Sequence, residues 1–151
     1  MNYEYKGRNL KDYIESVKVM SVAVTDEDKP VSSVVLFMLD NDLCFYFLTK
    51  RITRKAIALG KNPKISISLW RKNELLINAF GEAREIPNIT ENSDYFDKFR
   101  KLSQEYGNDY WPLEGVDGSE YVLYKMMTQW MKVVDLSSSG VGMEEEIIYF
   151  D

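Results

Sequence analysis

Three consecutive residues carry the clearest chemical signal in this chain: Thr53, Arg54 and Lys55. They open a short segment, residues 53–59, that we predict to be a helix with Thr53 as its N-cap. The first turn of a helix has unpaired N–H groups and the positive end of the helix dipole, and both attract anions. Because a hydroxyl and two cations are added at the same place, we expect a phosphate-binding site here.

Two predicted strands, residues 43–49 and 64–69, lie on either side of this short helix. Asn62-Pro63 prevents the helix from continuing into the second of them. Aromatic residues are frequent around both strands, which therefore offer a wall for a flat molecule. A phosphate clamp beside a flat, apolar wall suggests flavin mononucleotide (FMN) as the ligand.

The composition excludes several other kinds of chemistry. The chain has no histidine and one cysteine, Cys44, so it cannot supply an imidazole or multi-thiolate zinc site or a Ser-His-Asp triad. We assign no metal ligand and no catalytic side chain, and we expect a bound cofactor to carry any difficult chemistry. The net charge of −5 argues against nucleic acid as the main partner.

The 151 residues are enough for one domain with a substantial core. No apolar run has transmembrane length, and the N-terminal residues show no signal-peptide pattern, so we expect no membrane partner and a cytoplasmic location. The single cysteine fits a reducing compartment, and we expect Cys44 to be an unreactive, buried strand residue.

Hydrophobic periodicity predicts a mainly β (α+β) protein. Residues 8–17 and 92–106 have helical spacing, and Tyr95, Phe96 and Phe99 are expected in the core. Short turns separate the predicted strands, as in a meander, and Gly81 is expected to permit a bulge. Long coiled strands in a meander favour a closed or half-closed barrel. The six predicted strands are residues 19–25, 31–39, 43–49, 64–69, 75–86 and 121–136, the last with a break near Thr128.

The spacing of three elements resembles a known family. Phe47-Leu-Thr49, Thr53-Arg-Lys55 and Asn62-Pro63 follow one another as in the pyridoxamine 5'-phosphate oxidase-like family of FMN-binding proteins, and Gly81-Glu-Ala-Arg84 is similar to that family's Gly-x-Ala strand. The resemblance covers roughly residues 10–135. It implies a six-stranded antiparallel split β-barrel with peripheral helices, formed by residues 1–136. Residues 137–151 are then a C-terminal tail, whose apolar end we expect to dock on the protein or on a partner subunit.

The resemblance also implies a cofactor site between the two subunits of a homodimer. Thr53, Arg54 and Lys55 would hold the FMN phosphate, and Leu48 and Thr49 would line the cofactor. The backbone of Ser33, Val34 and Val35 would run along the isoalloxazine ring. Trp130 of the partner subunit would cover that ring.

The chain departs from the family pattern in three places. The strand from Ser33 to Met38 lacks the Arg and Lys of pyridoxamine phosphate oxidases, no Gln stands near Leu76, and residues 133–151 lack the Arg-rich substrate signature. Oxidation of vitamin B6 is therefore not expected. We expect a small FMN-dependent oxidoreductase acting on a small-molecule substrate. The alternative is a non-catalytic binding protein for flavin, haem or another flat ligand on the same scaffold.

Overall fold

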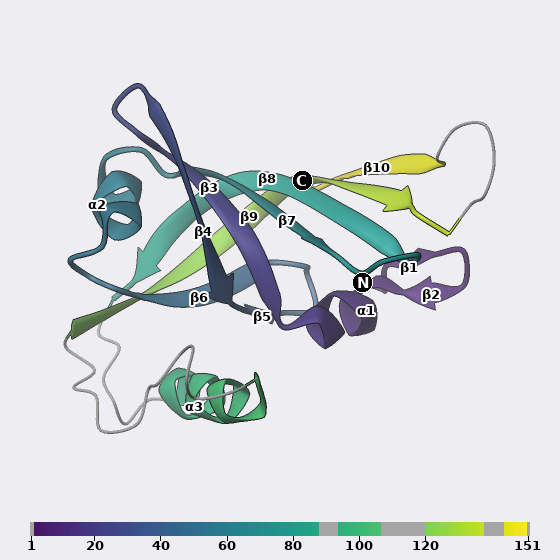
Figure 1. Ribbon diagram of the computed structural model, residues 1–151, viewed down its shortest axis with the longest axis horizontal. Helices are drawn as coiled ribbons and strands as arrows, with labels where there is room; N and C mark the ends of the chain where they lie inside the picture. Colours follow the sequence, from purple (N-terminus) through teal and green to yellow (C-terminus); the bar gives the residue numbers. More distant parts are fainter. Residues whose placement is uncertain (1, 88–93, 107–119, 138–143, 151) are drawn as a thin grey trace.

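A single curled antiparallel sheet forms the framework of the molecule (Figure 1). The computed structural model describes residues 2–87, 94–106, 120–137 and 144–150. In this part of the chain the strand order is β4-β3-β7-β8-β9-β6-β5, and β10 pairs with β9. The sheet curls into a half-barrel in which β4 and β6 approach one another. The strands are β3 (Val19–Asp26), β4 (Lys29–Leu36), β5 (Met38–Leu39), β6 (Phe45–Lys50), β7 (Lys64–Trp70), β8 (Leu75–Ile86), β9 (Tyr121–Asp135) and β10 (Glu145–Tyr149).

This architecture confirms the prediction of a mainly β, antiparallel split barrel with peripheral helices. The six predicted strands correspond to β3, β4, β6, β7, β8 and β9, and the sheet gains β5 and β10. The helices are α1 (Leu10–Val17), α2 (Arg54–Lys61) and α3 (Asp94–Tyr106). A two-residue turn with positive φ at Lys6 and Gly7 joins β1 (Glu4–Tyr5) to β2 (Arg8–Asn9), a hairpin that the sequence pattern did not predict.

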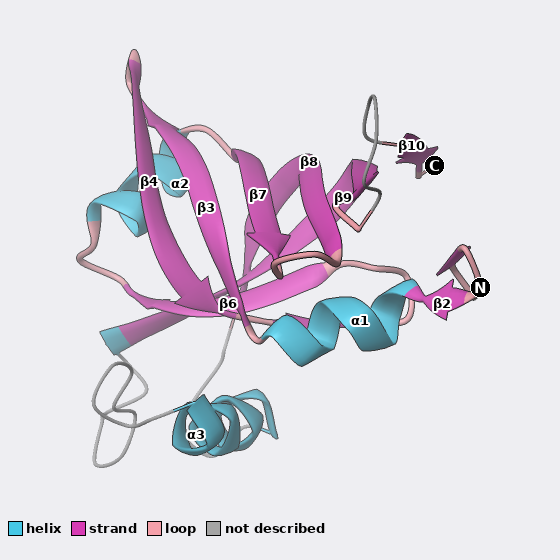
Figure 2. Ribbon diagram, turned by 45° about the vertical axis from the view of Figure 1, so that its right-hand side comes forward, coloured by secondary structure: helices cyan, strands magenta, loops and turns pink. Residues whose placement is uncertain are grey.

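Two apolar clusters lie on opposite sides of β6. Phe45 and Phe47 point into the main core inside the curl, which α1 and α2 also help to fill. Tyr46 and Leu48 point the other way, toward a second cluster under α3 that contains Phe96 and Phe99. This alternation follows from the two-residue period of a strand. Both α1 and α3 lie on the β6 side of the half-barrel (Figure 2).

The single strand predicted over residues 31–39 is wrong in its extent, because pairing with β3 ends at Leu36 and the chain turns at Phe37. There the backbone N–H of Phe37 bonds to the carbonyl of Lys18 at the end of α1. Only Met38 and Leu39 then pair with β6, whereas β4 pairs with β3 along its whole length. β6 itself begins at Phe45, since Leu43 has a left-handed backbone with φ of 58°.

The bulge expected at Gly81 is confirmed. The register between β8 and β9 shifts there, so that Phe80 faces Trp130 while Gly81 faces Thr128. Gln129 is the extra residue on β9, and its carbonyl accepts the N–H of Phe150. β9 is therefore continuous through Thr128, where a break was expected, because the bulge absorbs the change of register.

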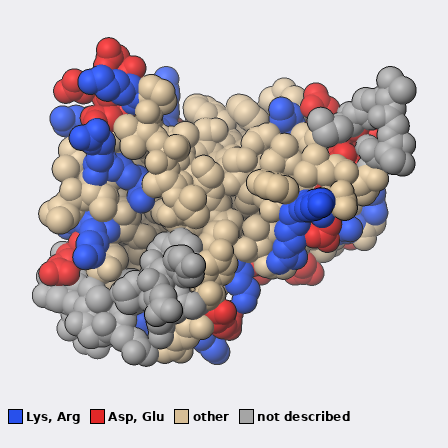
Figure 3. All heavy atoms as spheres, viewed as in Figure 1, with Lys and Arg blue, Asp and Glu red and all other residues tan. Residues whose placement is uncertain are grey.

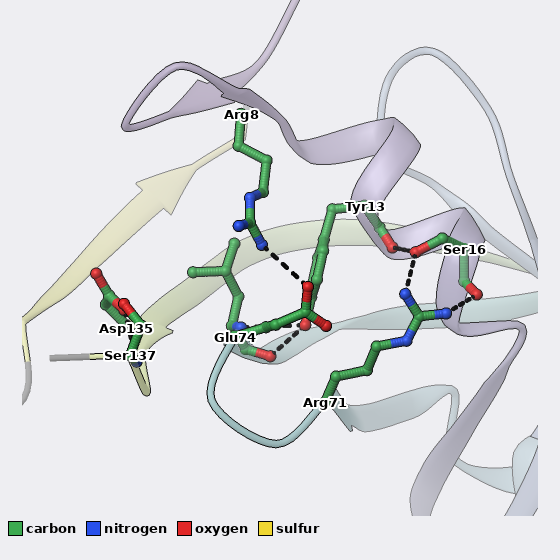
Figure 4. A network of polar contacts seen from close by, with 8 residues as sticks. Arg8, Tyr13, Ser16, Arg71, Glu74, Asp135 and Ser137 are labelled. Carbon is green, nitrogen blue, oxygen red and sulfur yellow. Dashed lines mark hydrogen bonds and ion pairs between the residues drawn. The ribbon is translucent and has the colours of Figure 1, made fainter.

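A polar network fixes α1 against the turn between β7 and β8 (Figure 4). The Tyr13 hydroxyl donates to the carbonyl of Leu75 over 2.6 Å and accepts the N–H of the same residue over 3.1 Å. Arg71 donates to the side chain and the carbonyl of Ser16, and Arg8 pairs with Glu74 at 3.7 Å. Burial raises the pKa of Tyr13, so this hydroxyl stays neutral while it both donates and accepts.

The C-terminal segment joins the sheet of its own chain. β10 pairs with residues 130–134 of β9. It lies along the same edge of β9 as β6, which pairs with residues 121–126. Ile148 and Phe150 pack against the main core, and the ring of Phe150 lies 5.3 Å from that of Tyr3. Two of the apolar residues of the tail are thereby docked on the half-barrel, whereas Ile147 and Tyr149 on the other side of β10 are exposed.

Candidate functional site

The start of α2 is built as the sequence predicts, with Thr53 as its N-cap. The Thr53 side chain accepts the N–H of Ala56 and donates to the carbonyl of Lys50, the last residue of β6. Its hydroxyl also lies 3.1 Å from that of Thr49. The helix runs two residues beyond the predicted end, with Asn62 as its C-cap. The first turn of α2 therefore meets the end of β6 at two neighbouring hydroxyls.

Lys55 joins this helix start to strand β4. Its Nζ donates to the Ser33 hydroxyl over 3.1 Å, and in the described part of the chain it makes no ion pair. Burial lowers the pKa of Lys55, because its ammonium loses water and no carboxylate among the described residues compensates for that loss. A half-buried cation with only a hydroxyl as its partner is suited to receive an anion.

Arg54 is more exposed and extends in another direction. Its side chain is 72% exposed and lies 3.6 Å from the Asp26 carboxylate at the end of β3. Arg54 and Asp26, with Ile52 and Ile57, line a hollow of about 440 Å³ beside the start of the helix. Charged side chains gather around α2 and the β3–β4 turn, whereas the surface over the middle of the sheet carries few charges (Figure 3).

The structure thus brings together four of the predicted site residues at the start of α2, as the pairs Ser33–Lys55 and Thr49–Thr53. Arg54 leaves the same helical turn toward Asp26. The neighbouring cation Arg51 is engaged elsewhere, with Glu85 at 3.1 Å and with the carbonyl of Tyr121. The hydroxyls of Ser33, Thr49 and Thr53 and the cation of Lys55 form a small, hydroxyl-rich cationic group at the N-terminus of a helix. Phosphate groups are favoured at helix N-termini of this kind.

The other four predicted residues lie apart from this group. Val34 follows Ser33 on β4 but points to the opposite side of the strand, where it is 54% exposed, and Val35 is buried in the main core. Leu48 packs in the cluster under α3. Trp130 stacks on Phe80 with ring centroids 6.0 Å apart. Within one chain, none of these four side chains makes a described contact with Lys55 or Thr53.

Trp130 belongs instead to a surface of small and aromatic side chains that was not predicted from the sequence. We call the side of the sheet turned away from the main core the outer face. Strand pairing places Ser32, Ala23, Ser66, Phe80, Trp130 and Tyr149 side by side across it. Trp70 lies on the same face and is 58% exposed, and Tyr149 is 74% exposed. The alternation of β7 could have indicated this surface, because Trp70 lies on the same side of the strand as Ser66 and Ser68, opposite the buried Ile65, Ile67 and Leu69.

The curled antiparallel sheet with its peripheral helices is the fold of a split β-barrel protein. Residues 7–135 match the family model described as pyridoxamine 5'-phosphate oxidase, so the chain belongs to this family. No curated protein is similar enough to match the chain. None of the described helices is long and apolar enough to cross a membrane.

Solved structures confirm the fold. General stress protein 26 from Bacillus anthracis str. Sterne has 20% identity and a TM-score of 0.61, covering 93% of this chain and 98% of that one. A pyridoxamine 5'-phosphate oxidase-related, FMN-binding protein from Nostoc punctiforme has 12% identity and a TM-score of 0.60, covering 93% and 91%. The haem storage protein HutZ from Vibrio cholerae has 17% identity and a TM-score of 0.59, covering 80% and 87%.

Proposed function

We propose that this protein binds FMN, with the phosphate at the N-terminus of α2. Lys55, Thr53 and Ser33 contact the phosphate, Thr49 supports the Thr53 hydroxyl, and the exposed Arg54 adds a positive charge at the rim. The observation that carries this proposal is the half-buried Lys55 ammonium, which has a hydroxyl but no carboxylate as its described partner. A phosphate would supply the missing negative charge and accept further hydrogen bonds from the helix N–H groups.

We place the flavin ring along β4, next to the backbone of Ser33, Val34 and Val35, with Leu48 lining the site through its strand. β4 is the edge of the sheet, so the backbone on its free side has no strand partner in the described chain. The exposed Val34 side chain adds apolar surface there. This position lies within reach of the phosphate site because Ser33 contacts Lys55.

We propose that a second copy of the chain completes the site. The outer face combines small residues on β3, β4 and β7 with large aromatic ones on β8, β9 and β10. Exposed aromatic side chains among small ones, such as Trp70 and Tyr149 here, are enriched at subunit interfaces. In the homodimer, Trp130 of one copy covers the flavin of the other, and the two copies exclude water from the ring.

The reaction proposed is a small flavin-dependent oxidation or reduction in the cytoplasm. When bound, FMN would supply the hydride or electron chemistry, and the chain would bind, orient and shield it. The alternative ligand is haem, since the haem storage protein HutZ has the same fold. The anion site favours FMN, and the chain has no histidine to serve as the common axial ligand of haem iron.

Binding of FMN and of riboflavin, which lacks the phosphate, tests the phosphate assignment. We expect Lys55→Met and Ser33→Ala to weaken FMN binding, the former by about 10- to 100-fold, as for loss of a charged hydrogen bond. Riboflavin binding should change little. Lys61→Met is the matched control, because Lys61 lies at the other end of α2. Equal losses for both flavins, or an unchanged FMN affinity in the Lys55 variant, would contradict the assignment.

Two further measurements test the dimer and the activity. We expect the mass in solution to be that of two chains, and Trp70→Arg on the outer face to reduce it to one, whereas Ile52→Arg at an exposed site off that face should not.

Bleaching of bound FMN by NADH or NADPH would support an oxidoreductase. Bound flavin that no nicotinamide cofactor reduces favours the binding protein.

A further inference from the structure

A cavity of about 520 Å³ lies between α1, α3 and the chain around β5 and β6. It shares no residue with the phosphate site at α2, whose residues come from β4, the end of β6 and α2. Figure 2 shows α1 and α3 on the same side of the half-barrel, with β6 beside both. The volume is within the usual range of about 300–1,000 Å³ for sites that bind small molecules.

The walls of this cavity are largely apolar and aromatic. Phe37 and Leu39, both nearly fully buried, contribute apolar surface, and Leu102 contributes more from α3. Tyr46 on β6 and Tyr95 on α3 stack with ring centroids 5.8 Å apart and an angle of 21° between the rings. Tyr95, which was expected in the core, lies partly exposed at this cavity. A flat hydrocarbon or aromatic body can pack against such walls.

The carboxylates that line the cavity all have partners. Glu15 pairs with Lys11 at 2.7 Å, and Glu105 pairs with Lys18 at 2.9 Å. Asp40 accepts the Tyr46 hydroxyl at 3.1 Å and two backbone N–H groups, and it lies 3.9 Å from Lys125. A cationic ligand would have to compete with these partners.

Two cations of the cavity have no such partner. Lys98 and Lys101 both line it from α3, and in the described ranges of the chain neither makes an ion pair. They are three residues apart and therefore lie on neighbouring positions of one helix face, beside Tyr95 and Leu102. Lys101 also contributes, after Lys18, to lowering the pKa of Glu105 one helical turn further along α3.

We infer that this cavity binds a small aromatic monoanion, such as an arylcarboxylate or arylsulfonate. The aromatic body packs against Phe37, Leu39 and the Tyr46–Tyr95 pair, and the anionic group is held by Lys98 and Lys101. This site is a second ligand site, separate from the proposed FMN site and independent of it.

The test uses two fluorescent probes that differ by one charged group. Anilinonaphthalene sulfonate carries the anion, and N-phenylnaphthylamine has the same rings without it. We expect the wild-type protein, saturated with FMN, to bind the sulfonate more tightly than the neutral probe. The double variant Lys98→Met/Lys101→Met should weaken sulfonate binding about tenfold, as for two partly exposed ion pairs, and leave the neutral probe unchanged. Tyr95→Ala should weaken both probes.

Control variants separate this inference from the proposed function. Lys64→Met removes an exposed lysine on β7 and should change nothing. Lys55→Met should weaken FMN binding by about 10- to 100-fold without changing sulfonate binding in the flavin-free protein. If Lys55→Met weakens the sulfonate and the Lys98/Lys101 variant does not, the probe occupies the phosphate site and the inference is overturned. It is overturned equally if both probes bind the double variant as they bind wild type. If the double variant melts at a lower temperature than wild type, the single variants Lys98→Gln and Lys101→Gln replace it. Each is expected to lose part of the sulfonate affinity.

Discussion

Gly81 on β8 passes so close to Met127 on β9 that a Cβ atom at Gly81 would clash with the Met127 carbonyl oxygen. No side chain can be accommodated there without moving backbone, because the neighbouring atoms belong to the strand and not to a flexible side chain. Gly81→Ala should therefore disturb the bulge and lower the free energy of unfolding by about 1–3 kcal/mol. Urea denaturation of the flavin-free protein measures this.

Gly60 provides the matched control for that substitution. It lies within α2, and a Cβ atom there would meet nothing within 4 Å. Gly60→Ala should raise the free energy of unfolding by about 0.4–1 kcal/mol, because alanine loses less conformational freedom on folding. Equal effects of the two substitutions would show that the close approach at Gly81 is unimportant for stability.

Lys55 is predicted to reduce the stability of the flavin-free protein while enabling it to bind FMN. Since burial lowers its pKa in the folded state, the unfolded chain holds the proton more tightly. The free energy of unfolding therefore rises with pH between the lowered pKa and the ordinary value of 10.5, where the unfolded chain binds more protons. Lys55→Met should remove this rise, and it should increase the melting temperature of the flavin-free protein at neutral pH.

Melting curves with and without FMN check both halves of this prediction. Wild type should melt at a higher temperature when FMN is added, whereas the Lys55→Met protein should show a much smaller increase. Lys61→Met should behave as wild type in both conditions. A flavin-free Lys55→Met protein that melts below wild type would indicate that the Lys55–Ser33 hydrogen bond outweighs the cost of burying the charge.

Local signals in the sequence were sufficient to predict the start of α2 and the bulge. Thr53 is a preferred cap, Asn62-Pro63 ends the helix, and Gly81 interrupts an otherwise regular strand. Each of these features depends on residues close to one another in the chain. The six long strands could be predicted for the same reason, because the hydrophobic periodicity of a strand is visible within a few consecutive residues.

Features that depend on distant contacts could not be predicted in this way. The break at Phe37 arises because its N–H bonds to Lys18 at the end of another element. The outer face and the cavity beside α3 arise from strand order and helix packing, which bring Phe80 next to Trp130 and Tyr46 next to Tyr95. The sequence therefore indicates which residues are candidates for phosphate binding, whereas the packing of the folded chain determines which of them come together.

Thr53 connects the stability of α2 with the proposed phosphate site. Its side chain caps the helix and contacts Thr49, so Thr53→Ala should lower the free energy of unfolding by about 1 kcal/mol and also weaken FMN binding. Thr53→Ser keeps the hydroxyl and should retain most of both properties. Urea denaturation and FMN titration of the two variants measure this, and a serine variant as poor as the alanine variant would point to a role for the methyl group instead.

Asp135 at the end of β9 is predicted to contribute stability that is lost in acid. Its carboxylate pairs with Lys6 of the β1–β2 turn at 2.7 Å and accepts both the N–H and the hydroxyl of Ser137. These contacts hold the pKa of Asp135 well below its ordinary value of 3.8. Because the folded state then holds the proton less tightly than the unfolded chain, this stabilisation is complete above pH 3.8 and is lost as the pH falls toward the lower, folded-state pKa.

Asp135→Asn should accordingly lower the melting temperature at neutral pH, and the difference from wild type should shrink as the pH falls below 3.8. Added salt should reduce the difference at neutral pH as well, because Lys6 is half-exposed and its attraction to the carboxylate is screened. Asp28→Asn, at an exposed turn between β3 and β4, is the control and should show no such dependence. A difference between the Asp135 variant and wild type that stays constant from neutral pH into acid would mean that the asparagine disturbs packing, and that the charge of Asp135 contributes little.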